Sequence, residues 1–173
     1  QTRSAEVERV LGMLADPHGS ISSIHDQLIN TDLKFSPAQD NQGQAQPVAQ
    51  ATIPPTGIQS PDREYRRTAW QSFFDGHLGM QNTLAAAYLT HVKTSVFGAR
   101  VRNYNSVLEA RLKPTGLPVE VFHNLVNTFK ANLGTWHRYW EAKRKVLGQA
   151  EMRPYDIWAP LTLPGSTQAA NPA

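Results

Sequence analysis

Residues 118–148, with the sequence PVEVFHNLVNTFKANLGTWHRYWEAKRKVLG, are the stretch that decides the fold class. Apolar side chains recur in it at the spacing of one helical face, at Phe122, Leu125, Val126, Phe129, Leu133, Trp136 and Trp140. Pro118 suits a first helical position, the basic residues 143–145 suit the negative end of a helix dipole, and Gly148 suits a helix stop. We therefore predict one long helix whose aromatic stripe, tryptophans included, is buried in a core.

A second long helix is predicted to begin at residues 60–64, SPDRE. A serine cap, a proline in the first turn and acidic side chains near the positive end of the dipole all favour a helix start. One face of this helix is then apolar, at Tyr65, Ala69, Phe73, Met80, Leu84, Tyr88, Val92 and Val96. Gly76 and Gly79 predict a kink or a close helix contact within it. We expect the helix to reach about Ala99 and to pack antiparallel against the helix of residues 118–148.

The first sixty residues predict shorter elements. A short helix follows from one apolar stripe, formed by Val7, Val10, Leu11 and Leu14. Pro17 and Gly19 are expected to end it, and Ser20 to cap a second short helix. The turn signal DNQG at residues 40–43 predicts a small β-hairpin, and residues 54–57, PPTG, a connector.

These signals predict a mainly α fold with long antiparallel helices, short helices and a small β-hairpin. Ser106–Leu112 is predicted to be helical as well, and Tyr155–Leu161 extended. The expected organisation along the chain is short N-terminal helices over 1–34, a hairpin and connector over 35–59, a helical lobe over 60–161 and a flexible tail over 162–173.

Composition excludes several classes of protein. The chain has 173 residues and no cysteine, so a disulfide scaffold, a cysteine-based zinc finger, an iron–sulfur site and a thiol nucleophile are excluded. No apolar run approaches about 20 residues, and the first nine residues are polar, so neither a membrane-spanning helix nor a secretory signal is expected. The net charge of +3 is only a weak hint of a nucleic-acid partner.

The histidines give little sign of a metal site. The six are His18, His25, His77, His91, His123 and His137, and none belongs to an H-E-x-x-H motif. Glu120 and His123 have the E-x-x-H spacing of a di-iron ligand pair, but no second such pair is present. We therefore expect these histidines to be structural.

Two clusters of basic and aromatic residues suggest binding. Trp136, Tyr139 and Trp140 alternate with basic residues and could stack on nucleic-acid bases, although a core role is the better interpretation. Arg100, Arg102 and Arg111 surround Tyr104. This cluster suits an acidic partner or a peptide carboxylate, and equally suits pairing with Glu109 and the acidic residues of a neighbouring element.

Blocks spread from Glu8 to Leu161 resemble, in order, the oligoendopeptidase F family of zinc metallopeptidases, relatives of thimet oligopeptidase. They are ERVL at 8–11, DP at 16–17, DLKF at 32–35, SPDREYRRTA at 60–69, RNYNSVLEARL at 102–112, LPVEVF at 117–122, RY at 138–139, LG at 147–148 and YDIWAPL at 155–161. No single block is specific, but the ordered set is.

The resemblance implies a helical part of a larger peptidase, one that walls a narrow channel for short peptides. In that family the zinc ligands lie in an H-E-x-G-H motif and a further Glu, within a catalytic domain that follows the YD block. None of these is present here, so this resemblance implies no catalytic, metal-binding or identified substrate-binding residue in the chain. We expect it to be inactive alone, with zinc and catalysis in a missing catalytic domain and the complete enzyme in the cytoplasm.

Two other functions stay open on the sequence alone. One is a stand-alone helical interaction module with an exposed apolar face, and the other is a weakly basic nucleic-acid-binding bundle, which the small net charge makes the less favoured. If a catalytic domain is missing, the apolar surface that packs on it is exposed, and the purified chain should self-associate.

Overall fold

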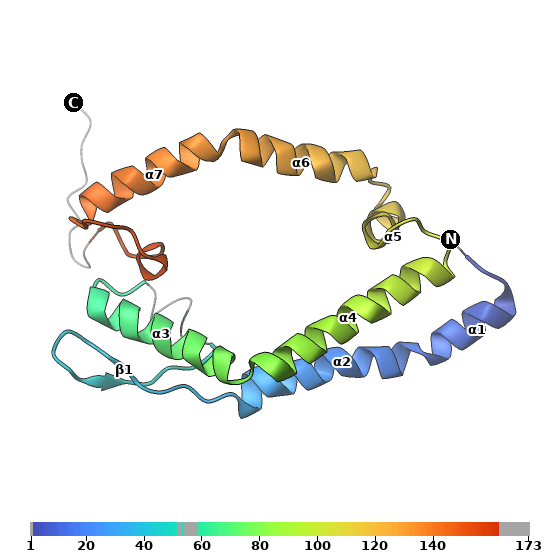
Figure 1. The fold of residues 1–173 in the computed structure, drawn as a ribbon, viewed down its shortest axis with the longest axis horizontal. Coiled ribbons are helices and arrows are strands. Elements are labelled where there is room, and N and C mark those ends of the chain that lie inside the picture. Colours follow the sequence, from blue (N-terminus) through green and yellow to red (C-terminus); the bar gives the residue numbers. More distant parts are fainter. Residues whose placement is uncertain (1, 52, 54–58, 163–173) are drawn as a thin grey trace. The chain divides into compact units, whose positions relative to one another are not determined.

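The fold is mainly helical, as the sequence predicts, and the computed structural model describes residues 2–51, 53 and 59–162 (Figure 1). The predicted connector at 54–57 and all but the first residue of the predicted tail at 162–173 lie outside these residues. The chain folds as two compact units, each of which combines two separate segments. Unit 1 contains 1–33 and 80–133, and unit 2 contains 34–79 and 134–173.

Unit 1 is built from helices. It holds α1 (Ala5–Met13), α2 (Ala15–Gln27), the π-turn η1 (Leu28–Asp32), α4 (Gln81–Val101), α5 (Val107–Leu112), the 3₁₀ turn η3 (Lys113–Thr115) and α6 (Val119–Ala131). The packing partners of α4 in this unit are α2 and α5. α2 runs antiparallel to α4, because His18 contacts Phe97 while His25 lies beside Leu84.

Unit 2 combines a hairpin with two helices. It holds β1 (Ala38–Gln39), β2 (Ala45–Gln46), α3 (Arg63–Gly79), α7 (Leu133–Val146), whose first residue belongs to unit 1, and the 3₁₀ turn η4 (Pro154–Asp156). The predicted hairpin is confirmed: β1 and β2 are antiparallel, with Gln39 opposite Ala45. Its turn closes on the Asp40 carboxylate, which accepts hydrogen bonds from the backbone N–H groups of Gln42 and Gln44, and Gly43 has φ +75°.

Both long helices of the sequence prediction are interrupted: the break directly after Gly79 confirms the kink predicted there, and the break at Asn132 corrects the prediction of one continuous helix over 118–148. Met80 separates α3 from α4 with φ −109° and ψ 14°, and Asn132 ends α6 with φ −102° and ψ 8°. The Asn132 side chain donates to the Thr128 carbonyl, and a glycine lies close to each break. Glycine has low helix propensity, and side-chain bonds of this kind compete with the helix. The antiparallel partner of α4 is α2, rather than the helix predicted over 118–148.

The N-terminal helix boundary was also predicted wrongly. α2 begins at Ala15 and continues through Pro17 and Gly19. Pro17 is tolerated because it lies in the first turn, where its missing N–H would have no helical partner. Ser20 therefore lies inside α2 and donates to the Asp16 carbonyl instead of capping a helix.

Few apolar side chains are buried, and a small cluster of them lies in unit 2. Ala38, Ile53 and Ala69 are buried, with Val48, Tyr65 and Phe73 packed against them. The predicted core stripe of residues 118–148 is largely exposed instead: Leu125 is 67% exposed, Phe129 53% and Trp136 45%. Helical spacing predicted the apolar face correctly, but no described segment of its own unit buries these side chains.

Candidate functional site

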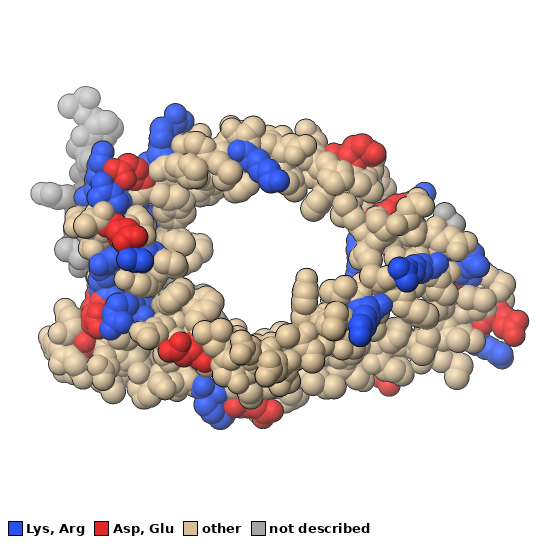
Figure 2. All heavy atoms as spheres, viewed as in Figure 1, with Lys and Arg blue, Asp and Glu red and all other residues tan. Residues whose placement is uncertain are grey.

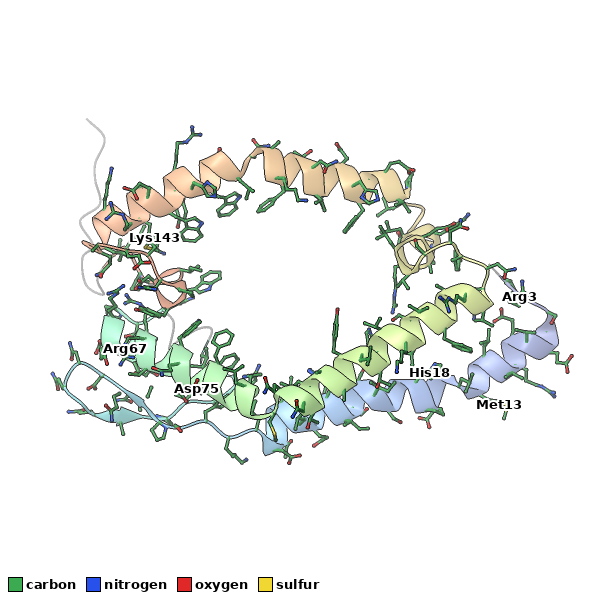
Figure 3. All side chains as sticks on the ribbon, viewed as in Figure 1. Arg3, Met13, His18, Arg67, Asp75 and Lys143 are labelled. Carbon is green, nitrogen blue, oxygen red and sulfur yellow. The ribbon has the colours of Figure 1, made fainter. Side chains whose placement is uncertain are left out.

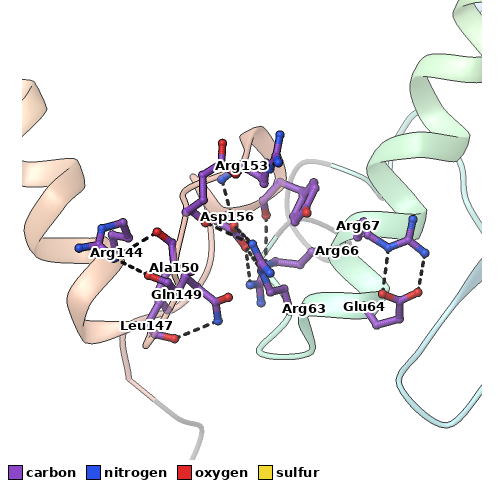
Figure 4. Close-up of polar contacts among 12 residues, drawn as sticks. Arg63, Glu64, Arg66, Arg67, Arg144, Leu147, Gln149, Ala150, Arg153 and Asp156 are labelled. Carbon is purple, nitrogen blue, oxygen red and sulfur yellow. Dashed lines mark hydrogen bonds and ion pairs between the residues drawn. The ribbon is translucent and has the colours of Figure 1, made fainter.

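A buried ion cluster in unit 2 fixes the segment after α7 (Figure 4). Asp156 of η4 is fully buried, and its two carboxylate oxygens accept bonds from Arg63 and Arg66 of α3. The Arg63 pair is bidentate, at 3.1 and 2.8 Å, and Arg66 Nη2 lies 2.9 Å from Oδ1. Asp156 also accepts the Arg153 backbone N–H. We call these residues the Asp156 cluster.

Two buried cations bind backbone carbonyls around this cluster. Arg66 is 2% exposed and donates to the carbonyls of Ser60, Pro61 and Tyr155. Lys143 of α7 is also buried, and its ammonium donates to the Ile157 carbonyl at 2.7 Å (Figure 3). Each buried cation thus has hydrogen-bond partners, as burial of charge requires.

Burial and charge shift the pKa of these groups. Burial by itself would raise the pKa of Asp156, but the hydrogen bonds from Arg63 and Arg66 outweigh it and lower the pKa below its usual value. Burial, followed by the positive charge of Arg66, lowers the pKa of Lys143. The cluster therefore holds Asp156 ionised and acts as a cross-link between α3 and the 150–160 segment.

The cross-link positions an aromatic groove in the same unit. The groove has a volume of about 760 Å³ and is lined by Thr135, Trp136, Tyr139, Trp140, Lys143, Ile157 and Trp158. Trp136 and Trp140 stack with ring centroids 6.2 Å apart, and Lys143 Nζ lies 5.9 Å from the Trp140 ring. Trp158 is 60% exposed. Exposed aromatic rings around a concave surface are typical of a site that binds an apolar group.

Unit 1 carries a second, basic groove between α2, α4 and α5. Its volume is about 750 Å³, and its polar lining includes His18, His91, Arg102, Tyr104, Arg111 and Lys113. Basic side chains lie over the C-terminal end of α4 (Figure 2). No Asp or Glu lines the groove among the described residues, so its lining is positively charged.

Some of the predicted arginine cluster is paired. Arg102 forms a bidentate ion pair with Glu8 of α1, at 2.6 and 2.9 Å, and this pair lowers the pKa of Glu8. Glu109 instead accepts bonds from the Asn105 backbone and side chain and lies 3.9 Å from Lys113. Arg111 lines the basic groove and has no ion pair within the part of the chain that the structure describes.

The third candidate surface is the exposed apolar side of α6. We call Phe122, Leu125 and Phe129 the α6 stripe; all three are exposed. Their spacing places them on one helical face. An apolar stripe of this kind in a described unit marks an interaction surface rather than a core.

The histidines are spread over both units, although His18 and His91 line the basic groove together. His77 packs against Phe73 and Phe35 in unit 2, while His18 packs against Phe97 in unit 1. Of the E-x-x-H pair on α6, His123 is exposed. Within the described ranges, no group of three or more His, Cys, Asp or Glu could hold a metal ion.

Arg63 and Arg66 lie in one of the sequence blocks and Asp156 in another, and no local signal joins the two blocks. The structure brings the block at 60–69 into contact with the block at 155–161, and the block at 8–11 into contact with the block at 102–112. The block at 102–112 contains a serine followed three residues later by a glutamate, a spacing typical of a helix start. In the structure Ser106 caps α5 by accepting the Glu109 N–H. Among the described residues, no helix has both the length and the apolarity that a membrane crossing requires.

Comparisons with known proteins agree on one family. Residues 57–166 match the model of peptidase family M3. The chain is 32% identical over 158 residues to oligopeptidase PepF of Bacillus subtilis, covering 91% of this chain and 23% of that protein. It is 28% identical to group B oligopeptidase PepB of Streptococcus agalactiae, covering 92% of this chain and 26% of that protein.

A solved structure has the same fold. The crystal structure of oligoendopeptidase-F from Enterococcus faecium superposes with a TM-score of 0.87 at 29% identity, covering 92% of this chain and 31% of that one. The chain thus spans about a quarter of the length of the curated relatives that it matches.

Proposed function

This chain belongs to peptidase family M3, as an oligoendopeptidase F-like member, and on that premise we propose that it is the non-catalytic helical part of a zinc oligoendopeptidase. In this proposal the complete protein hydrolyses short peptides, and the chain forms one wall of the channel that admits them. The named relatives are oligopeptidases and oligoendopeptidases, which supports peptides as the substrate class.

The observation that carries the proposal is the amount of ordered apolar surface left exposed. The α6 stripe in unit 1 and the aromatic groove in unit 2 each present large apolar side chains that their own unit does not bury. Because the relatives are about four times longer than the match, the remainder of such a protein is the proposed cover for part of this surface. The remaining exposed apolar surface of the chain would face the peptide substrate.

Zinc and catalysis belong elsewhere in this proposal. The described residues offer no set of three metal ligands, and the 173 residues contain no H-E-x-x-H motif. Zinc in a peptidase of this kind activates the attacking water. In this proposal the chain supplies none of that chemistry, and its proposed roles are to bind the catalytic part and to contact the peptide. The expectation of a cytoplasmic location rests on the family resemblance alone and stays a prediction.

The test uses the full-length protein and internally quenched peptides of graded length. We expect hydrolysis of short peptides, loss of activity on chelation and recovery with zinc. Trp136→Ala in the aromatic groove should raise KM and alter the length preference, whereas Ile24→Ala, which removes an exposed apolar side chain of α2, should change neither. A full-length protein without metal-dependent peptidase activity would overturn the proposal and favour the stand-alone interaction module.

A further inference from the structure

We propose that the basic groove of unit 1 binds a peptide carboxylate and that Arg111 is its principal ligand. That the ligand is a peptide rests on the proposed peptidase function. That the group bound is a carboxylate is inferred from the charged side chains of the groove. Such a site would make the helical part a determinant of substrate choice, separate from the aromatic groove of unit 2.

The charge balance of the groove favours an anion. Arg102, Arg111 and Lys113 line it, and no carboxylate does so among the described residues. Glu8, from outside the lining, neutralises Arg102 through two short hydrogen bonds. Glu109 is 3.9 Å from Lys113, a long distance for an ion pair, and its other oxygen is held by Asn105. Arg111 is left without a counter-ion in the described part of the chain.

The groove is also held in place before any ligand binds. The Glu8 pair keeps the Arg102 guanidinium directed toward α1 rather than across the groove. The Ser106 cap fixes the start of α5, so that Val107, Ala110 and Arg111 face the groove together at helical spacing. Arg111 therefore starts from a defined backbone position, and a guanidinium binds a carboxylate through two parallel hydrogen bonds.

The size and charge of the groove favour a peptide over a nucleic acid. A volume of about 750 Å³ lies in the range of small-ligand sites and accommodates the end of a peptide. A nucleic-acid backbone would need several uncompensated cations to neutralise successive phosphates. Of the three cations that line the groove, Arg102 is paired with Glu8 and Lys113 has Glu109 at 3.9 Å. Arg111 is therefore the one without a carboxylate within ion-pair distance among the described residues, which matches a single carboxylate. The hydroxyl groups of Thr94 and Ser95 provide additional polar lining.

The experiment compares matched substrates on the full-length protein. One internally quenched peptide is made with a free C-terminal carboxylate and with a C-terminal amide, and a second pair carries Asp or Asn in its sequence. The variant is Arg111→Gln. The control is Arg100→Gln, which removes the same charge from an exposed residue of α4 that does not line the basic groove.

We expect the wild-type protein to favour one carboxylate form over its neutral counterpart by at least about tenfold in kcat/KM, because tenfold is at the low end of what hydrogen bonds to a charged group contribute. Arg111→Gln should remove this preference through KM with little change in kcat, and Arg100→Gln should retain it. The pair that responds identifies the source, a terminal or a side-chain carboxylate. The proposal would be overturned if wild type and Arg111→Gln had the same ratio of kcat/KM between carboxylate and neutral peptides. It would also be overturned if Arg111→Gln and Arg100→Gln lost the preference equally.

A second readout separates this inference from the proposed function. The same peptides are titrated into the full-length protein by calorimetry, which does not require hydrolysis. We expect the wild-type protein to bind the neutral peptide more weakly than its carboxylate form. If Arg111→Gln removes this difference in affinity and Arg100→Gln does not, the carboxylate site is supported even if no peptidase activity is found. Hydrolysis without any charge preference would leave the proposed function standing and refute the groove assignment.

Discussion

Replacing Asp156 with asparagine should destabilise unit 2 by about 3–5 kcal/mol, the cost of breaking a buried ion pair from one side. The size of this loss in stability depends on the two arginines that remain after the carboxylate is removed. Arg66 is 2% exposed, and Asp156→Asn leaves its guanidinium buried without a counter-charge at 2.9 Å. Arg63 is less affected, because its side chain is 38% exposed and water can solvate it.

Tryptophan fluorescence during urea unfolding of the 173-residue chain measures this effect. All four tryptophans, Trp70, Trp136, Trp140 and Trp158, belong to unit 2, so the signal reports on that unit. The matched control is Asp75→Asn, because Asp75 is an exposed residue of α3 with no ion pair among the described residues. This control should change the free energy of unfolding by less than about 0.5 kcal/mol.

The pH dependence of the stability provides a second test of the same prediction. The pKa of Asp156 is lowered in the folded state, so its stabilising effect is complete above its unfolded-state pKa, about 3.9, and is lost as pH falls through the folded-state value. The difference in stability between wild type and Asp156→Asn should therefore be constant near neutral pH and shrink below about pH 4. A variant as stable as Asp75→Asn at pH 7, or a difference that grows in acid, would refute the cross-link reasoning.

Two further predictions test the packing and the exposed surface. A Cβ at Gly76 would lie 2.8 Å from the Phe35 ring, which stacks on Phe73, so Gly76→Ala should destabilise unit 2 by about 1–3 kcal/mol in the same urea assay. Gly79 has open space around its Cβ position, so Gly79→Ala should stabilise by about 0.5–1 kcal/mol, and equal effects at both sites would contradict the packing argument. The 173-residue chain should self-associate through the α6 stripe; Phe129→Ser should weaken this association in sedimentation, and a wild-type chain that stays monomeric at high concentration would count against it.

Local signals predicted part of the local structure of this chain, but the prediction that residues 155–161 are extended is wrong at their start, which lies in the 3₁₀ turn η4. The DNQG turn and the period of each helical segment, Ser106–Leu112 included, depend on residues within a few positions of one another, and the corresponding elements are present. Helix boundaries were predicted less well. A single Asn132 or an early Pro17 moves a boundary through the backbone bonds that it makes or omits, and hydrophobic periodicity does not register this.

The burial of the apolar side chains could not be predicted from the sequence, for a physical reason. A 3.6-residue period shows that a helix has an apolar face, but what covers that face depends on segments elsewhere in the chain or outside it. The α6 stripe and Trp136 were therefore assigned to a core that the described units do not form.

The blocks that resemble the oligoendopeptidase F family supplied what periodicity did not. Some of their charged residues meet over long separations: Arg63 and Arg66 bind Asp156, and Glu8 binds Arg102. Each of these pairs joins segments about ninety residues apart and lies within one unit. The blocks thus mark the cross-links that fix the two grooves, so substitutions in them are expected to act on peptide binding indirectly, through groove geometry. Arg111 belongs to the same blocks but has no such partner among the described residues, and this difference is why we assign it to a ligand instead of to the fold.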